Sequence, residues 1–543
     1  MTKYFKLHKR QFVIYLLVSI VYALILAGTG FVYSLLTDAA LGDNFQRFLG
    51  VAIFAIIFLI ADSYFDFVPR YIRAKLVNNI LHSLRSELIT HYMEKDLQAI
   101  MEEDPTVRTD HLVNQLEVVE TSYLKPLLSS IISVFVFGFS LAGAFYLQGT
   151  LTLIMLALCF LPFLAPVINQ RVLSNKKHIA QTGKKTYLAK FEDFSRNLST
   201  LRLANSSAIF AKLLHKSSRT TAGASVDFEK GQAQTYAISY GLSNIVYSGT
   251  WVIGGIFVFK NLLTVPELIA MTTLMGTVAG PIQTVSELTT EFTSSKKVVS
   301  EFLATLSETS SSKSSPGKPF NEEITELTLM HVNYRRKKQV IFNELSYTFQ
   351  MGNKYAIIGE SGAGKSTLLQ LLMGILTPEE GTIRLNGEAL TDFDKASYYR
   401  HFSYVPQRTA IFSGTIAENV SLFQEINEDK VREALHKAGL KNWLASQEEG
   451  LRTNLTANRL SGGEERRLDI ARALYREAEM IILDEPTSGL DQKNEQLISE
   501  VIASLTDKLV IVVTHSTQPD FLASFDQVIQ LKNKQIVQQS LAN

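Results

Sequence analysis

Long apolar stretches dominate the chain up to about Glu291 and limit what this half can form. A bilayer's hydrocarbon core accommodates about 20 helical residues, and six segments approach that length. They lie at roughly 11–36, 47–69, 124–146, 150–170, 236–260 and 266–292. The charge-rich remainder has the pattern of an ordinary globular α/β domain. We therefore predict a membrane half followed by a soluble half.

The bulk composition agrees with this division. The 46% hydrophobic content exceeds that of a usual soluble enzyme. The net charge of +1 and the lack of a clustered basic domain give no support for a nucleic-acid partner, and none is expected. The single cysteine, Cys159, allows neither an intrachain disulfide nor a cysteine metal site. The basic start resembles a secretory signal, but its apolar stretch is too long, so we expect a retained first membrane helix.

The distribution of lysine and arginine predicts the orientation in the membrane. The N-terminus and the connections at about 70–125 and 171–235 are basic, whereas 37–46 and 147–150 contain no lysine or arginine. Both termini and both long connections are therefore expected in the cytoplasm. We expect a multi-pass protein of the cell membrane, of bacterial type, with the lipid bilayer as one of its partners.

The two long connections have apolar residues every three or four positions, which indicates helix rather than loop. The membrane helices are therefore predicted to continue into the cytoplasm. Each excursion is expected to reverse at a short polar segment, near 103–111 in the first and 196–206 in the second. These two tips would face the soluble domain.

One face of the sixth segment is polar or small. Its residues are Thr273, Thr277, Gly280, Thr284, Glu287 and Glu291. Such a face either lines a pathway or reflects threonines that bond their own backbone beside small residues that allow close packing. An amphipathic soluble helix is a further alternative for the whole segment. Asp62, in the second segment, is either a functional residue or part of a structural ion pair.

The stretch "GESGAGKST" fits the pattern G-x-x-x-x-G-K-[ST], between an apolar strand-like run and a helical pattern. Its glycines let backbone N–H groups surround a β-phosphate, while Lys365 supplies charge and Ser366 a hydroxyl for Mg²⁺. The predicted phosphate-binding residues are Gly359, Glu360, Ser361, Gly362, Ala363, Gly364, Lys365, Ser366 and Thr367.

Two acids end the second strand-like run, "MIILDEP". Asp484 is predicted to hold Mg²⁺ through water, and Glu485 to polarise an attacking water. Between the two motifs lies "RLSGGEERRLDIARAL", where two glycines open a charged helix and create a second anion site. A single nucleotide does not need two such sites, which suggests that the second serves the nucleotide of a partner.

The sequences "LSGGE", "RRLDIARAL" and "ILDEPTSGLD" resemble the signature region of ATP-binding cassette (ABC) ATPases. In that family the signature of one subunit closes over the ATP of the other. Six spans followed by one cassette are similar to a half-size ABC exporter. The resemblance implies an all-α six-helix transmembrane bundle with long cytoplasmic extensions, followed by an α/β P-loop ATPase domain. It divides the chain into a transmembrane domain at 1–305, a linker at 306–320 and a nucleotide-binding domain at 321–543.

The resemblance also assigns individual residues. Tyr334 matches the aromatic that stacks on adenine, although a plain strand aromatic would look the same. Gln407 matches the glutamine that touches Mg²⁺, and His515 the switch histidine that contacts the γ-phosphate. Together with Glu485, these two are the predicted catalytic residues. The signature and D-loop positions are Ser461, Gly462, Gly463 and Asp491.

Some positions depart from the family pattern. Glu464 stands where glutamine is commoner, and the D-loop reads SGLD rather than SALD. The segment 452–459 lacks the acidic-glycine pattern that usually couples cassette to membrane domain.

Taken together, the resemblance implies ATP-driven export by a homodimer or heterodimer of half-transporters that uses ATP and Mg²⁺. The cargo is unidentified, and amphipathic drugs, lipids and peptides all remain open. ATP-driven uptake and a membrane sensor or gate that moves no cargo are the alternative functions.

Overall fold

The computed structural model divides the chain into two compact units. The first contains Met1–Lys95 and Glu103–Ser311, and the second contains Asp96–Glu102 and Ser312–Asn543. The structure describes every residue except 162–163, 309–316, 337–338, 456–459, 491, 517 and 540–543. It leaves undescribed the side chains at 164–171, 282–294, 308, 492–493 and 538–539 as well.

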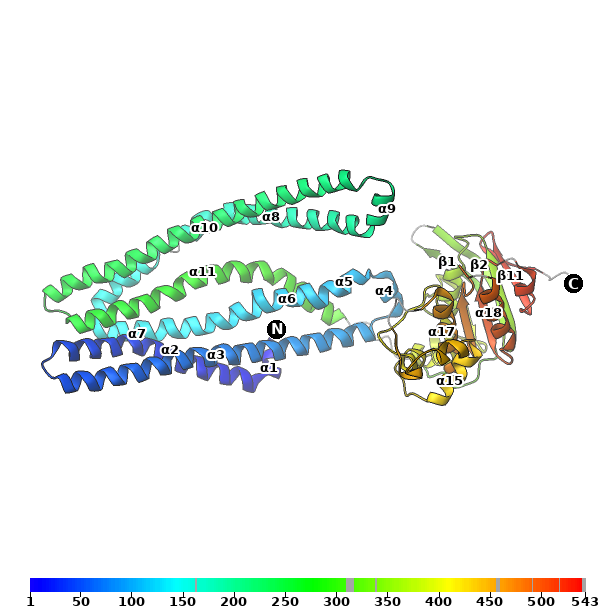
Figure 1. Cartoon of the computed structure of the whole chain (residues 1–543), viewed down its shortest axis with the longest axis horizontal. Helices are drawn as coiled ribbons and strands as arrows, with labels where there is room; N and C mark the ends of the chain where they lie inside the picture. Colours follow the sequence, from blue (N-terminus) through cyan, green and yellow to red (C-terminus); the bar gives the residue numbers. More distant parts are fainter. Residues whose placement is uncertain are drawn as a thin grey trace. The chain divides into compact units, whose positions relative to one another are not determined.

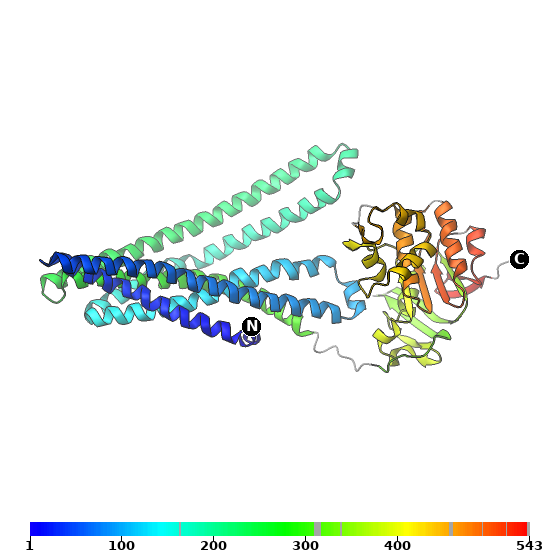
Figure 2. The same ribbon diagram turned by 60° about the horizontal axis from the view of Figure 1, so that its bottom comes forward.

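The described part of the first unit is helical (Figure 1). Its elements are α1 (Thr2–Leu7), α2 (Lys9–Leu41), α3 (Phe45–Glu94), α5 (Pro105–Asp110), η1 (His111–Gln115), α6 (Leu116–Val118), η2 (Val119–Leu124), α7 (Lys125–Cys159), α8 (Leu164–Arg196), α9 (Leu198–Leu203), α10 (Ser207–Phe259) and α11 (Val265–Glu308). Figures 1 and 2 show α2, α3, α7 and α11 running lengthwise beside one another. Helices α8 and α10 form a long hairpin that diverges from them toward α9.

Several of these helices suit a membrane. Within the described residues, α2, α3, the stretch Pro105–Cys159 and α10 are long and apolar enough to cross one, judged by length and composition. Helix α7 contains the third predicted span and the start of the fourth, and its backbone leaves the helical conformation at Gln148 (φ −157°, ψ 99°). Gln148 lies between the two predicted segments, so this break is the connection that the sequence indicated.

The first half of the polar face on α11 is used for packing. Thr272 and Thr273 donate to carbonyls of their own helix at 2.8 and 3.0 Å. Thr277 donates to the Ser140 hydroxyl of α7 at 2.8 Å. A Cβ at Gly30 of α2 would lie 3.1 Å from a carbonyl oxygen of α11, which shows how closely these helices approach. The packing alternative therefore holds here, whereas the side chains of 282–294 lie outside the described residues.

Among the described residues, Asp62 is not seen in the ion pair considered for it. Its Oδ1 atom is enclosed and has no hydrogen-bond partner among the described residues. Its neighbour Asp66 pairs instead with Arg70, one helical turn further along α3, at 3.0 Å. The described residues therefore give no support for the structural ion pair at Asp62.

The second unit is an α/β domain with short connecting helices. Its strands are β1 (Glu326–Arg336), β2 (Gln339–Gln350), β3 (Lys354–Gly359), β4 (Glu380–Leu385), β5 (Glu388–Ala389), β6 (Phe402–Val405), β7 (Gly414–Thr415), β8 (Asn454–Leu455), β9 (Met480–Asp484), β10 (Leu509–Val513), β11 (Gln527–Lys532) and β12 (Gln535–Gln539). Its helices are α4 (Leu97–Glu102), α12 (Lys365–Leu372), η4 (Leu390–Asp392), α13 (Lys395–Tyr398), α14 (Ile416–Ser421), α15 (Glu428–Lys437), α16 (Lys441–Ala445), η5 (Gly450–Arg452), α17 (Gly462–Tyr475), α18 (Gln492–Ser504) and α19 (Pro519–Leu522).

A mostly parallel sheet forms the centre of this unit. Among the described residues its strand order is β12-β11-β3-β10-β9-β6, and only the edge strand β12 runs antiparallel. A second, antiparallel sheet has the order β2-β1-β4-β5. The strand β10, "LVIVV", is buried along its whole length because alternate residues enter two different cores. Burial on both faces explains why the central strands read as continuous apolar runs.

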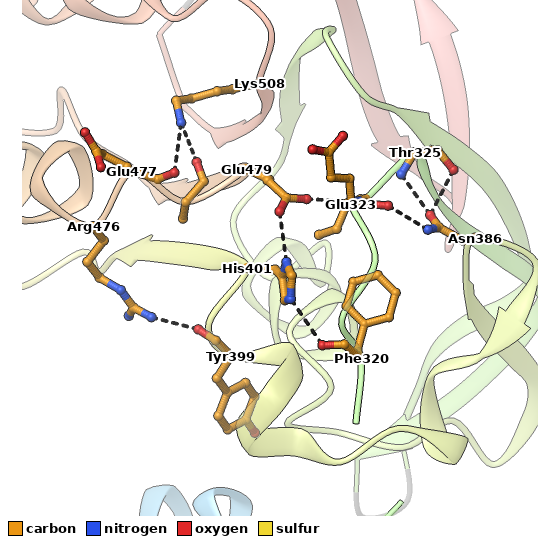
Figure 3. Close-up of polar contacts among 12 residues, drawn as sticks. Phe320, Glu323, Thr325, Asn386, Tyr399, His401, Arg476, Glu477, Glu479 and Lys508 are labelled. Carbon is orange, nitrogen blue, oxygen red and sulfur yellow. Dashed lines mark hydrogen bonds and ion pairs between the residues drawn. The ribbon is translucent and has the colours of Figure 1, made fainter. Parts of the chain in front are cut away.

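Polar contacts anchor the segment that leads into β1 (Figure 3). The His401 ring lies between the Glu479 carboxylate, 3.0 Å from Nδ1, and the Phe320 carbonyl, 3.3 Å from Nε2. The backbone N–H of Ile324 donates to the other Glu479 oxygen at 2.6 Å. The Asn386 side chain accepts from the Thr325 N–H at 2.8 Å. These bonds hold the segment 320–325, which leads into β1, against His401, Glu479 and Asn386.

The reversal of the first excursion lies earlier than the sequence indicated. The short helix α4 and Asp96 belong to the second unit, in which Lys395 Nζ donates to Asp96 at 2.9 Å. The expected segment 103–111 instead contains α5 and the start of η1. Proline at the first turn and the Asp104 cap favour helix there, which polarity alone did not reveal. The second reversal, at α9, lies within the expected 196–206.

Candidate functional site

The glycine-rich loop joins β3 to α12 at the carboxyl edge of the parallel sheet. Strand β3 ends at Gly359 and α12 begins at Lys365. Gly362 and Gly364 adopt left-handed conformations with φ of 82° and 98°. A Cβ at Gly364 would lie 2.7 Å from a side-chain carbon of Ile341, so glycine is required there for space as well as for conformation. The loop thus has the shape that the motif predicted.

Lys365 turns back across this loop. Its Nζ donates to the Gly359 carbonyl at 2.8 Å and to the Glu360 carbonyl at 3.1 Å. Burial lowers the pKa of Lys365, while the carboxylates of Glu485 and Asp484 oppose that shift. The ammonium group is therefore held in a partly dehydrated place where a phosphate would be a strong partner.

Strand β9 delivers the two acids to the same edge of the sheet. Asp484 is buried, and its burial, followed by the nearby charge of Glu485, raises its pKa. Lys365 and Arg466 oppose that rise, and Tyr404 forms a hydrogen bond with the carboxyl group. Asp484 therefore lies among compensating positive charges, close to the phosphate loop.

Glu485 brings the three predicted catalytic residues together. Gln407 Nε2 donates to one carboxylate oxygen of Glu485 at 2.7 Å. His515 Nε2 lies 3.1 Å from the other oxygen. Glu485 has an unusual left-handed backbone with φ of 51°, and its N–H donates to the Val513 carbonyl of β10 at 2.8 Å. Strained backbone of this kind is often found at functional sites.

Arg466 of α17 is a site residue that the sequence reasoning missed. Its guanidinium donates to the carbonyls of Pro406 and Gln407, and only 8% of the residue is exposed. It fixes the backbone of the loop that contains Pro406 and Gln407, here called the glutamine loop, against α17. A sign was present in the sequence, because a run of charges follows the signature, but such runs usually lie on a solvated face.

The signature residues begin α17. Ser461 caps the helix, since its hydroxyl accepts from the Glu464 N–H and the Glu464 carboxylate accepts from the Ser461 N–H. Gly463 is buried against Asn494, whose side-chain nitrogen would lie 3.1 Å from a Cβ at that position. Gly462 lines a hollow with Gln407 and Gly489, whereas His515 and Glu485 line another. The structure therefore places Gly462 of the signature and the switch histidine in neighbouring hollows that share Ser488.

Of the remaining predicted site residues, the structure describes Tyr334 but not Asp491. Tyr334 lies on β1 and packs against the core beneath the antiparallel sheet. Asp491 lies outside the described residues, as does the second half of the segment 452–459. The part of that segment that is described includes β8, which pairs with β7 in a short two-stranded sheet.

Comparison with known proteins gives matches in both units. The family model described as ABC transporter transmembrane region matches residues 12–282, and the model described as ABC transporter matches 342–488. A probable ABC transporter ATP-binding/permease protein of Haemophilus influenzae is 36% identical over 216 residues, which are 39% of this chain and 39% of that protein. The Mesentericin-Y105 transport/processing ATP-binding protein MesD of Leuconostoc mesenteroides is 28% identical over 498 residues, which are 88% of this chain and 67% of that one.

A solved structure shares the whole architecture. A bacterial Atm1-family ABC exporter with ATP bound superposes with a TM-score of 0.83 at 19% identity, covering 98% of this chain and 95% of that one. The predicted fold class, a helical transmembrane region followed by an α/β P-loop ATPase domain, is therefore confirmed.

Proposed function

Because the chain belongs to the ABC transporter family, we propose that it is an ATP-driven exporter working as a dimer, with two ATP sites between its cassettes. Family membership supports ATP hydrolysis coupled to transport. The direction, the pairing and the roles of single residues are proposals that rest on the site.

The position of Glu485 carries this proposal. One of its carboxylate oxygens accepts from Gln407 and the other faces His515. The carboxylate also contributes to the electrostatic field at Lys365. A base, a γ-phosphate contact and a phosphate-binding lysine are the groups that phosphoryl transfer to water needs in one place.

Each residue has a proposed task. Lys365 binds the β- and γ-phosphates, and the backbone N–H groups of the loop surround the β-phosphate. Glu485 accepts a proton from the attacking water, and Gln407 fixes the orientation of that carboxylate. His515 contacts the γ-phosphate, while Tyr334 stacks on the adenine. All of these residues except Tyr334 lie at or near the carboxyl edge of the parallel sheet.

The donor chemistry of the site fits Mg²⁺. Ser366, Gln407 and Asp484 offer a hydroxyl, an amide and a carboxylate, and Mg²⁺ prefers oxygen ligands. In the part of the chain that the structure describes, no group of three or more His, Cys, Asp or Glu side chains forms a metal cluster. This agrees with an ion that takes most of its ligands from water and phosphate. When bound, Mg²⁺ neutralises charge on the phosphates.

A second subunit would complete the site. Gly462 lines a hollow that adjoins the hollow of His515 at Ser488, and the helix N-terminus beside Gly462 suits an anion. We infer that Ser461, Gly462 and Gly463 contact the ATP of the partner, with Asp491 at the same interface. The partner is a second half-transporter, identical or different.

The domain arrangement is part of the proposal. Residues 1–305 would form the transmembrane domain, 306–320 a linker and 321–543 the nucleotide-binding domain. The excursions at about 70–125 and 171–235 would transmit cassette closure to the membrane helices, with both termini in the cytoplasm of a bacterial cell. Hydrolysis moves cargo only if ATP binding favours one membrane conformation and product release favours another.

Reconstitution into inverted vesicles tests the proposed function. A fluorescent phospholipid, a hydrophobic peptide and an amphipathic dye represent the substrate classes, and the parent is compared with Glu485→Gln. We expect the variant to bind ATP and to close, while its hydrolysis and transport fall by at least about 100-fold. Glu477→Gln, which changes an exposed carboxylate paired with Lys430, serves as the control that retains activity.

The outcomes separate the alternatives. Accumulation in inverted vesicles supports export, and accumulation in right-side-out vesicles indicates uptake. Hydrolysis that a probe stimulates without any flux indicates a sensor. Undiminished turnover in Glu485→Gln would remove Glu485 from its assigned task.

A further inference from the structure

A buried carboxylate of α18 lies beside the switch histidine. Glu495 is 9% exposed and lines the same hollow as Glu485 and His515. Its Oε1 accepts a hydrogen bond from the Ser516 hydroxyl at 2.7 Å. Ser516 directly follows His515 in the chain. The carboxylate therefore acts on the residue next to the histidine rather than on the histidine itself.

Ser516 is a fixed point in this loop. Its N–H donates to the Thr514 hydroxyl at 3.0 Å, and its hydroxyl accepts from the Gln518 N–H at 3.4 Å. Thr514 is itself tied to β3, because its N–H donates to the Ile357 carbonyl at 3.1 Å. The hydrogen bond from Ser516 to Glu495 joins this loop to α18.

Burial of a carboxylate is costly unless hydrogen bonds compensate it. An apolar residue would fill the same place at the start of α18 without that cost. The position of Glu495 at the hollow, with its oxygen on the serine hydroxyl, is therefore better explained by a need to fix the loop than by packing. The loop's histidine side chain is half exposed and extends to Glu485, so its direction depends on how firmly the backbone is held.

We propose that Glu495 is a positioning residue for His515, acting through Ser516. This inference rests on the proposed function, in which His515 contacts the γ-phosphate. The hydrogen bond from Ser516 to Glu495 sets the backbone from which the histidine projects. Loss of the bond lets the ring move away from the γ-phosphate and from Glu485, whereas the phosphate loop that binds ATP is untouched. The turnover number should then fall while ATP affinity stays constant.

The test compares variants of the full-length protein in lipid vesicles. Glu495→Ala and Ser516→Ala should each lower the kcat for ATP by about tenfold or more, because small misplacement of a reacting group costs up to about 100-fold. The dissociation constant for a fluorescent ATP analogue should change by less than about twofold in both. The double variant should be no slower than the worse single one, since both changes remove the same bond.

Glu495→Gln keeps the hydrogen bond to Ser516 and therefore tests the positioning role through kcat. Its amide oxygen still accepts the Ser516 hydroxyl, so kcat should return to within about threefold of the parent. Glu500→Ala changes an exposed carboxylate on the same helix and should leave kcat and thermal midpoint unchanged. The reasoning is overturned if Glu495→Ala turns over like the parent, if the two alanine variants add their effects, or if Glu495→Gln is as slow as Glu495→Ala.

His515→Ala separates the positioning role of Glu495 from the proposed contact of His515 with the γ-phosphate. If that variant is inactive while Glu495→Ala turns over normally, the positioning role is wrong and the switch histidine stands. If His515→Ala hydrolyses ATP at the parent rate, the assignment of the histidine is wrong and the role of Glu495 is overturned with it. An inactive His515→Ala together with the pattern above supports both.

Discussion

Replacement of Arg472 by methionine tests the buried polar network of α17. The guanidinium group donates to the Asn419 and Ala410 carbonyls at 2.8 and 2.7 Å. It also bonds Asp469 Oδ1 at 2.7 Å and the Asn419 side chain at 3.0 Å. Arg472 is 7% exposed and Asp469 is 4% exposed, so water cannot replace these bonds. Methionine fills a similar volume but donates nothing.

The expected loss of folding stability follows from the Asp469 carboxylate, which stays buried in the variant. Breaking a buried ion pair by removing one partner costs about 3–5 kcal/mol, because the other charge stays buried without compensation. Burial already raises the pKa of Asp469, with Arg472 among the groups that oppose the rise. Without Arg472 that pKa rises further, so the folded state binds a proton more readily than the unfolded state. The free energy of unfolding of the variant should then fall as pH rises above the ordinary carboxyl value of 3.8.

Trp443 offers an assay within the cassette. The chain has 2 tryptophans, and Trp443 of α16 packs against the core that includes α17. A Trp251→Phe background therefore reports unfolding of this region by fluorescence during urea titration of the full protein in detergent. Arg472→Met should lose about 3–5 kcal/mol at neutral pH, and less at acidic pH. Asp469→Asn added to that variant should recover part of the loss.

A surface arginine provides the matched control. Arg432 pairs with Glu428 across 3.5 Å with both side chains about half exposed, so Arg432→Met should change stability by no more than about 0.5 kcal/mol. The reasoning fails if Arg472→Met behaves like Arg432→Met. It also fails if the loss caused by Arg472→Met grows as the pH is lowered from neutral toward 5, since the sign of the linkage would be wrong.

Three further outcomes are expected. Gly364→Ala should abolish ATP binding in a fluorescent-nucleotide assay, because the new Cβ would collide with Ile341; retained affinity would contradict this. Thr277→Val should cost about 0.6 kcal/mol of stability through the lost bond to Ser140 and leave probe transport within about twofold, so a lost transport rate would favour a pathway role instead. Chelation of Mg²⁺ should stop phosphate release, and hydrolysis that persists in excess EDTA would refute the metal requirement.

Much of the site could be predicted from the sequence because its residues follow parallel strands. The carboxyl ends of such strands meet at one edge of a sheet, so motifs far apart in the chain converge there. The contact of Gln407 and His515 with Glu485 is a consequence of that rule. Four described helices, α2, α3, the stretch Pro105–Cys159 and α10, also agree with predicted spans, since lipid requires long apolar helices. Even the break at Gln148 fell between two predicted segments.

The packing of helices against one another was not predictable. The threonines of α11 could have faced water or protein with the same sequence period, and only the approach of α2 and α7 decides between them. Asp62 is a similar case, because the residue that could pair with it depends on how α3 is rotated about its own axis. In both, the decisive quantity is a distance between elements, which a single sequence does not contain.

Three charged residues of α17 would be predicted from the sequence to lie on an exposed face, but they are buried. Arg466, Asp469 and Arg472 recur every three residues, which normally indicates a solvated face with alternating charge. The structure buries this stripe, and Arg466 and Arg472 donate to the backbone carbonyls of Pro406, Gln407 and Ala410 in the loop beside it. Backbone acceptors of that kind must be satisfied in the interior, and a guanidinium with several donors does so well. Arg466 therefore satisfies carbonyls of the loop that places Gln407 on Glu485, and Arg472 satisfies those of Ala410 and Asn419.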